Sequence, residues 1–212
     1  MSLQNDYKLT DRATIRNLES ILKILDDVKP VLIGGIAVAA YANYYNINYD
    51  RETKDIDFII NENKKIDTKG IIYSKLPSLP IKEGKIFGYD GIEIKYKDGP
   101  SISILFKDKE VPYNEIELNL GKKKIKLYIA KMEYLLVDKI FTYLKRDEEK
   151  DWRDIEILSS LMKKYGYDEE LLYKIFDEYS NSSRYRKYAL EAKNIMEKIL
   201  KYVKESDILD IL

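Results

Sequence analysis

The hydrophobic period of the chain changes near Ala130, and this change restricts the fold more than any other feature of the sequence. Before it, short apolar runs alternate with polar residues at a period of two, which is typical of β-strands. After it, apolar residues recur about every 3.6 residues, which is typical of amphipathic helices. The sequence therefore predicts an α+β domain with a mixed sheet flanked by helices in residues 1–130. A helical bundle that packs on this domain is predicted for residues 131–212.

The expected elements follow from the same patterns. In the first part we expect helices at residues 11–26 and 36–45, with buried strands at 31–35 and 54–60. Further strands are expected at residues 70–76, 84–90, 92–97 and 101–106, followed by a hairpin over 114–130 that turns at Gly121. In the second part we expect helices at residues 131–146, 151–166, 168–180 and 183–205.

The composition excludes several kinds of chemistry. The 212 residues include no cysteine and no histidine, so disulfides, thiolate or imidazole metal sites and a histidine base are all excluded. Lys plus Arg and Asp plus Glu both number 37, so no global attraction to nucleic acid or membrane is expected. Because no leader or membrane-spanning run is visible, we expect a cytoplasmic protein with no membrane contact. The high content of Lys, Glu, Ile and Tyr is typical of a thermophile.

Two aspartates lie one residue apart in the otherwise apolar run "KDIDFII". In a strand, Asp55 and Asp57 project from one face while Ile56 points to the other. Two like charges at this spacing repel each other unless a cation lies between them, and oxygen ligands favour Mg²⁺ or Mn²⁺. Since Mg²⁺ usually combines few carboxylates with substrate phosphates, the pair predicts a phosphate-bearing substrate. The alternative is a solvated strand face whose aspartates pair with Lys or Arg.

Two glycines, Gly34 and Gly35, end the preceding strand just before a helix. Glycine lets the backbone approach a ligand closely, and the free N–H groups at a helix N-terminus bind anions. The sequence therefore favours a phosphate cradle and a metal site within one strand-helix-strand unit. A tight strand-to-helix turn with no ligand is the alternative.

The run "VLIGGIAVAAY" followed by "RETKDIDFII" resembles the nucleotidyltransferase superfamily with the DNA polymerase β-like fold. The later run "IAKMEYLLVDKIFTYLKRDEEKDWRDIEIL" is similar to small archaeal and bacterial members related to the AbiEii abortive-infection toxin. The resemblance covers residues 31–161. It implies transfer of a nucleotide from a nucleoside triphosphate to an RNA or protein acceptor, with Mg²⁺ or Mn²⁺ as cofactor. It also implies a toxin-like role with a cognate antitoxin as partner.

The resemblance also implies roles for individual residues. Gly34 and Gly35 would hold the nucleotide phosphates, and Asp55 and Asp57 would be catalytic and bind the metal. In the helical part, Lys139 would reach a phosphate.

A second helical residue, Asp154, would support the catalytic site from the helix after that of Lys139. From the residues alone, both positions are also explained by ordinary ion pairs on exposed helix faces.

One position departs from the superfamily pattern. The usual third carboxylate lies on a later strand, and the matching run "SISILF" has Ser103 there. Glu93, in "IEIKYK", would replace this metal ligand if its strand is the neighbouring one. If no residue replaces it, the chain would be a nucleotide-binding or partner-binding module without turnover.

A rival interpretation is a metal-dependent nuclease of the PD-(D/E)XK type, in which Asp57 and Glu93 bind the metal and Lys95 orients water. For RNA contacts the sequence offers the lysines of "GKKKIK" (residues 121–126) and the basic, tyrosine-containing run "SSRYRKY" (residues 182–188). A solvated turn and a basic helix face are the alternatives for these two runs.

Overall fold

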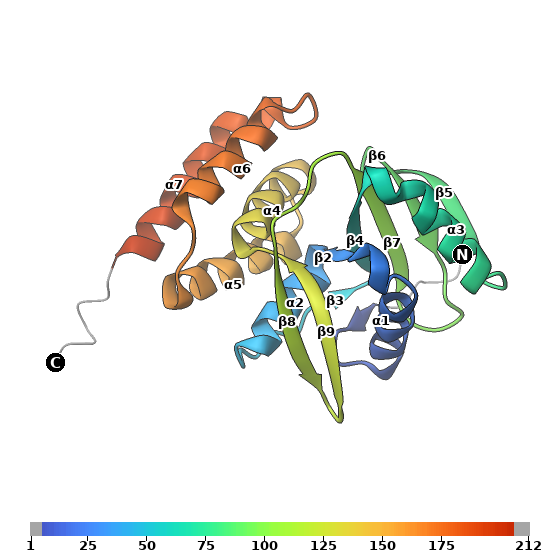
Figure 1. Ribbon diagram of the computed structural model, residues 1–212. Coiled ribbons are helices and arrows are strands. Elements are labelled where there is room, and N and C mark those ends of the chain that lie inside the picture. Colours follow the sequence, from blue (N-terminus) through green and yellow to red (C-terminus); the bar gives the residue numbers. More distant parts are fainter. Residues whose placement is uncertain (1–5, 206–212) are drawn as a thin grey trace. The chain divides into compact units, whose positions relative to one another are not determined.

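The computed structural model describes residues 6–205 of the chain (Figure 1). The chain divides into two compact units, residues 1–130 (unit 1) and 131–212 (unit 2). The predicted packing of the helical region on the α+β domain concerns the relation between these units and stays a prediction.

A mixed sheet forms the centre of unit 1. Seven strands of the described chain pair in the order β5-β6-β7-β4-β2-β9-β8. Their bounds are β2 (Val31–Ile33), β4 (Asp55–Asn61), β5 (Ile81–Ile86), β6 (Tyr89–Ile94), β7 (Ser101–Lys107), β8 (Tyr113–Leu120) and β9 (Lys123–Ala130). The β2–β9 and β4–β7 pairs are parallel, whereas the remaining pairs are antiparallel. Two short strands, β1 (Tyr7–Lys8) and β3 (Glu52–Thr53), pair separately.

Helices flank this sheet, as predicted. They are α1 (Arg12–Ile24), α2 (Gly34–Tyr44) and α3 (Lys65–Lys75), with short 3-10 turns at Asp26–Val28 and Glu62–Lys64. Every residue of α2 from Gly35 to Ala42 is buried, which fits its apolar, alanine-rich sequence. This helix contacts β2, β4 and β8. The strong packing of α2 holds its first turn firmly against the middle of the sheet.

One strand prediction in unit 1 is wrong, and another joins two strands into one. Residues 70–76, predicted as a strand because of their Ile-Ile pair, lie mainly in α3. The helix buries Thr68 and Ile72, which lie four residues apart on one helical face. It belongs to the crossover connection that the parallel pair of β4 and β7 requires. The predicted strand at 84–90 covers the end of β5 and the start of β6, which are separated by a hairpin turn at Phe87 and Gly88, both with positive φ. The hairpin at Gly121, with φ of 65°, is confirmed.

Unit 2 is helical, as predicted. Its helices are α4 (Met132–Arg146), α5 (Glu149–Tyr165), α6 (Glu169–Asn181) and α7 (Ala189–Lys204), with a 3-10 turn at Arg186–Tyr188 before α7. Phe141, Phe176, Tyr179 and Tyr185 pack against one another in its core. Burial, together with Asp138, raises the pKa of Tyr179 well above its ordinary value. Within residues 6–205, no helix is long and apolar enough to cross a membrane.

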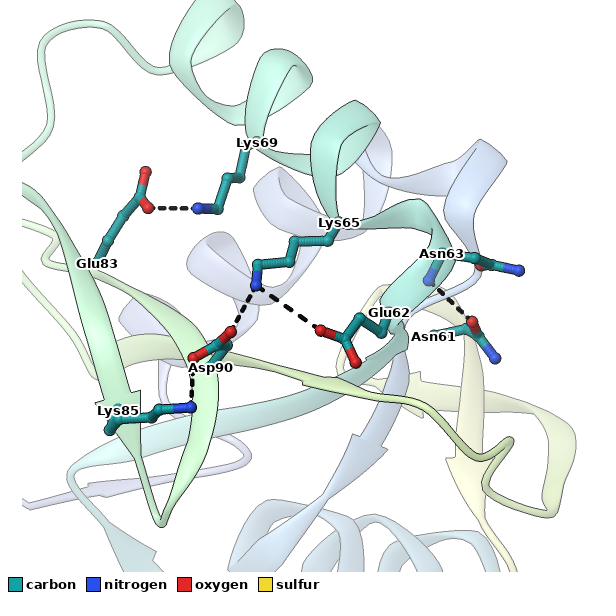
Figure 2. Close-up of polar contacts among 8 residues, drawn as sticks. All are labelled: Asn61, Glu62, Asn63, Lys65, Lys69, Glu83, Lys85 and Asp90. Atoms are coloured by element: carbon teal, nitrogen blue, oxygen red, sulfur yellow. Dashed lines mark hydrogen bonds and ion pairs between the residues drawn. The ribbon is translucent and has the colours of Figure 1, made fainter.

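Ion pairs join α3 to the edge hairpin of β5 and β6, as Figure 2 shows. The Lys65 ammonium lies 2.6 Å from Asp90 Oδ2, and Lys85 Nζ lies 2.6 Å from Asp90 Oδ1. Lys69 pairs with Glu83 beside them. The hydrogen bonds from Lys65 and then Lys85 lower the pKa of Asp90 to about 2.

This network predicts a specific acid dependence of stability. Because the pKa of Asp90 is lower in the folded state than its unfolded value of about 3.9, its contribution is present above about pH 4 and is lost as the pH falls towards 2. We expect Asp90→Asn to flatten the fall of Tm between pH 4 and pH 2, measured by circular dichroism. Asp67→Asn on α3 is the control, since Asp67 has no ion pair in the part of the chain described. Parallel profiles for wild type and Asp90→Asn would contradict the prediction.

Candidate active site

Asp55 and Asp57 lie on one face of β4, in the interior of the sheet between β2 and β7. Both are partly exposed, whereas Ile56 and Phe58 are fully buried on the opposite face. The strand therefore has the alternation that its sequence predicts, with its two carboxylates on the accessible side.

The strand register places a row of side chains across this face. Asp57 pairs with Ile33 of β2 on one side and with Ser103 of β7 on the other, and Ser103 pairs in turn with Glu93 of β6. Ser103 is 6% exposed and stands directly beside Asp57, in the position discussed for a third carboxylate. Since neighbouring strands lie about 4.8 Å apart, the backbone of Glu93 lies about 10 Å from that of Asp57. Glu93 is thus in the same row, but on the second strand away, and its Oε1 lies 3.8 Å from Lys95 Nζ.

Gly34 brings the first turn of α2 directly against this row. It has a φ of 73°, and a Cβ placed on it would lie 2.7 Å from Asp57 Oδ2. The missing side chain therefore provides the space that the Asp57 carboxylate occupies. The residue before the helix, Ile33, has an apolar side chain that makes no capping hydrogen bond to α2. The backbone N–H groups of the first turn of α2 therefore lie next to the Asp57 carboxylate, which is a candidate metal ligand.

Arg51 is a residue of this site that the sequence did not indicate. It is 8% exposed, and its Nη2 lies 2.8 Å from the position that a Cβ on Gly35 would take. Its Nη1 donates a hydrogen bond to the Glu52 carbonyl oxygen. Sixteen positions separate it from Gly35 in the sequence, so no local pattern relates the two. The turn is thus flanked by a carboxylate at Gly34 and a guanidinium at Gly35.

Lys139 and Asp154 meet within unit 2, together with Asp151. The Lys139 ammonium lies 2.6 Å from Asp154 Oδ2 and 3.0 Å from Asp151 Oδ1, and all three residues are at most 5% exposed. Burial alone would lower the pKa of Lys139, but Asp154 and Asp151 raise it above its ordinary value. These three residues, the buried triad, connect α4 to α5. Asp151 was not singled out from the sequence, although it lies one helical turn before Asp154.

Several residues considered for RNA contact are engaged with other groups. In the β8–β9 hairpin, Lys124 and Lys126 each lie 2.8 Å from a glutamate of β8, and Lys123 pairs with Glu19. Tyr185 of the second basic run is buried in the aromatic core of unit 2. This arrangement agrees with the alternative in which the hairpin turn is an ion-paired, solvated surface.

The carboxylates do not form a complete metal cage by themselves. Among residues 6–205, no group of three or more His, Cys, Asp or Glu side chains is placed to hold a metal ion. A hard cation at Asp55 and Asp57 would therefore complete its ligands with phosphate oxygens and water, as Mg²⁺ commonly does.

Known proteins are similar to this chain at the level of structure. No family model matches the sequence, and no curated protein matches it. The antibiotic-resistance factor ANT(2'')-Ia is similar over 88% of this chain and 99% of its own, with 14% sequence identity and a TM-score of 0.57. The lincosamide antibiotic adenylyltransferase LnuA has 18% identity and a TM-score of 0.47, over 71% of this chain and 99% of its own.

A nucleotidyltransferase-like protein from Paracoccidioides brasiliensis has 18% identity and a TM-score of 0.46, over 89% of this chain and 95% of its own. The similarity to ANT(2'')-Ia shows a shared fold. It confirms the predicted nucleotidyltransferase-like mixed sheet followed by helices.

Proposed function

We propose that this chain is a metal-dependent nucleotidyltransferase, which transfers a nucleotide from a nucleoside triphosphate to an RNA or protein acceptor. The observation that carries the proposal is the contact between the first turn of α2 and Asp57. Gly34 leaves room for the Asp57 carboxylate beside the N-terminus of α2, where the preceding residue, Ile33, provides no side-chain cap. Phosphate-binding N–H groups and metal-binding oxygens are therefore available to the same ligand.

The donor set at this site suits Mg²⁺ or Mn²⁺. Asp55 and Asp57 offer hard oxygen ligands from one strand face, and the chain has neither the cysteine nor the histidine that zinc or copper prefers. When bound, the ion would neutralise charge on the phosphates and activate the attacking hydroxyl. The two carboxylates hold the ion, and the first turn of α2 orients the phosphates that share it.

Glu93 is the proposed replacement for the missing third carboxylate. It stands beside Ser103 in the same row as Asp57, and the residue between them is a small buried serine. A glutamate side chain can extend over one strand spacing of about 4.8 Å, so Glu93 can share an ion held by Asp57 once it separates from Lys95.

Lys139 and Asp154 enter this proposal through the resemblance to AbiEii-related members. For Lys139 to reach a phosphate, it would exchange one of its two carboxylate partners for the ligand, while Asp154 keeps it oriented. A toxin-like role with a cognate antitoxin is the further implication of the same resemblance.

A nucleotide-binding module without turnover is the second candidate, favoured by Ser103 at the third-carboxylate position. The nuclease interpretation ranks lower. It gives the Gly34–Gly35 turn no role, whereas the proposed transferase uses that turn to hold the phosphates.

The test is to incubate the protein with each radiolabelled nucleoside triphosphate, Mg²⁺, and either total RNA or total protein. We expect one acceptor to become labelled, and Asp55→Asn with Asp57→Asn to lower the rate by about 100-fold or more, because metal stabilisation is worth several kcal/mol. Asp26→Asn with Asp27→Asn is the matched control, since it removes two exposed carboxylates of the same unit.

Other outcomes separate the candidates. Magnesium-dependent nucleotide binding that needs Asp55 and Asp57, without any labelling, would establish the binding module. Labelling that survives in the double variant would exclude this site as the catalytic centre. Cleavage of DNA that needs Glu93 and Lys95 would establish the nuclease.

A further inference from the structure

We propose that the Ser103 hydroxyl is the third protein ligand of the metal ion that Asp55 and Asp57 hold. This inference rests on the proposed function and gives a role to the residue that departs from the superfamily pattern. Ser103 stands between Asp57 and Glu93 in the row across β4, β7 and β6. The serine would thus bind the ion itself, rather than only leave a carboxylate missing.

Ser103 lies directly beside Asp57. The two residues are paired in the parallel ladder of β4 and β7, so their side chains point to the same side of the sheet. Ile102 and Ile104, the neighbours of Ser103 along the chain, point to the opposite side and are fully buried. Because neighbouring strands lie about 4.8 Å apart, an ion at the Asp57 carboxylate is within reach of the Ser103 hydroxyl.

The hydroxyl of Ser103 is available to a ligand. The residue is 94% buried, and its hydroxyl has no hydrogen-bond partner within residues 6–205. Such a polar group is unfavourable unless a ligand or water completes its interactions. Ser159 of α5, which is similarly buried, instead donates its hydroxyl hydrogen to the carbonyl oxygen of Ile155, as serines in helices commonly do. Ser103 therefore differs from an ordinary buried serine.

The charges at the site favour a neutral third ligand. Asp55 and Asp57 together carry two negative charges, which balance the two positive charges of Mg²⁺ or Mn²⁺. A carboxylate at position 103 would add a negative charge and repel the nucleotide phosphates that share the ion. A hydroxyl supplies an oxygen without this charge, as the serine or threonine of P-loop proteins does for Mg²⁺. We therefore expect weak binding of the ion alone and stronger binding together with a nucleotide.

Glu93 is less favourably placed than Ser103 for direct contact with the ion. It pairs with Ser103 on β6 and so lies one strand further from Asp57. Its Oε1 lies 3.8 Å from Lys95 Nζ, and coordination of a metal would separate this ion pair. The Ser103 hydroxyl has no partner to give up within the described chain.

The experiment measures Mn²⁺ binding to the full chain by electron paramagnetic resonance, with and without the α,β-methylene analogue of ATP. We expect Ser103→Ala to weaken Mn²⁺ binding about tenfold, because it removes the oxygen, and Ser103→Thr to stay within about twofold of wild type. Ser103→Asp should tighten binding of Mn²⁺ in the absence of the nucleotide. Ser101→Ala is the control, since it removes a buried hydroxyl from the same strand but outside the row of Asp57.

The possible results separate this inference from the proposed function. If wild type binds Mn²⁺ and Ser103→Ala binds it equally well, the inference is wrong while the proposed function stands. If wild type binds no Mn²⁺ with or without the nucleotide, both are wrong. Equal losses in Ser103→Ala and Ser101→Ala would indicate altered packing of β7 and would overturn the inference. A larger loss in Glu93→Gln than in Ser103→Ala would assign the third ligand to Glu93 and would also overturn it.

Discussion

Replacing Lys139 with methionine is expected to lower the free energy of unfolding by about 3–5 kcal/mol. The ammonium is the cation between two carboxylates that are almost completely buried, so the substitution leaves Asp151 and Asp154 as uncompensated charges. Urea denaturation followed by circular dichroism measures the change. Lys145→Met is the matched control on the same helix, because Lys145 is exposed, and we expect it to cost less than about 0.5 kcal/mol.

Asp151 and Asp154 should contribute unequally to the stability of the chain. Asp154 lies closer to the ammonium than Asp151 does, and Asp151 Oδ2 is a buried atom without a hydrogen-bond partner among the described residues. Asp154→Asn should therefore destabilise the chain more than Asp151→Asn. Replacing the whole buried triad with Met and Leu should restore much of the stability, because buried ion pairs are costly to desolvate. A Lys139→Met variant as stable as wild type would show that the triad does not hold α4 to α5.

The buried triad also has a defined dependence on pH. Because the carboxylates raise the pKa of Lys139 in the folded state, its stabilising contribution is complete below the unfolded pKa of about 10.4. It is lost as the pH rises through the folded value. The same property bears on function: a Lys139 that binds phosphate must first give up part of this ion pair.

Gly34→Ala is expected to lower the free energy of unfolding by about 2–3 kcal/mol and to abolish metal-dependent nucleotide binding. Part of the cost is the positive φ of 73°, which an alanine adopts at about 1–2 kcal/mol. The remainder comes from the new Cβ, which would lie 2.7 Å from Asp57 Oδ2 and would force the carboxylate to turn away. Chemical denaturation and calorimetric titration with Mg²⁺–ATP measure the two effects.

Gly121→Ala is the control that separates the cost of backbone strain from the cost of the contact between the new Cβ and Asp57. Gly121 also has a positive φ, of 65°, but a Cβ there would meet no atom within 4 Å among the described residues other than its chain neighbours. It should cost only the backbone strain and leave nucleotide binding unchanged. In an Asp57→Ala background, the excess cost of Gly34→Ala over Gly121→Ala should disappear. If Gly34→Ala binds Mg²⁺–ATP like wild type, the proposed site is not the nucleotide site.

The sequence predicted the fold class because hydrophobic period is a local property. The change near Ala130 distinguished strands from helices, and Gly121 marked the hairpin turn correctly. The same reasoning failed at residues 70–76, where two adjacent isoleucines favour a strand. The long-range requirement of the parallel β4–β7 pair overrode this local preference, and the segment folds within α3.

Some features of the candidate site were likewise predictable from the sequence, and others were not. The spacing of Asp55 and Asp57 was enough to place both on one face of β4, since side chains two apart in a strand always share a face. The sequence also indicated a junction between a strand and a helix at Gly34 and Gly35, but it assigned both glycines to the strand, whereas they form the first turn of α2. It could not give the register that sets Ser103 beside Asp57 and Glu93 one strand beyond, because pairing between distant strands leaves no periodic signal.

The sequence by itself determined which elements form and which residue types could carry the chemistry. Only the tertiary structure decided which of those residues meet. Arg51 reaches Gly35, and Lys139 meets Asp151 and Asp154, through chain folding over separations that no local pattern spans. The physical reason is that backbone geometry and hydrophobic period act over a few residues, whereas the contacts of the site depend on how buried elements pack together.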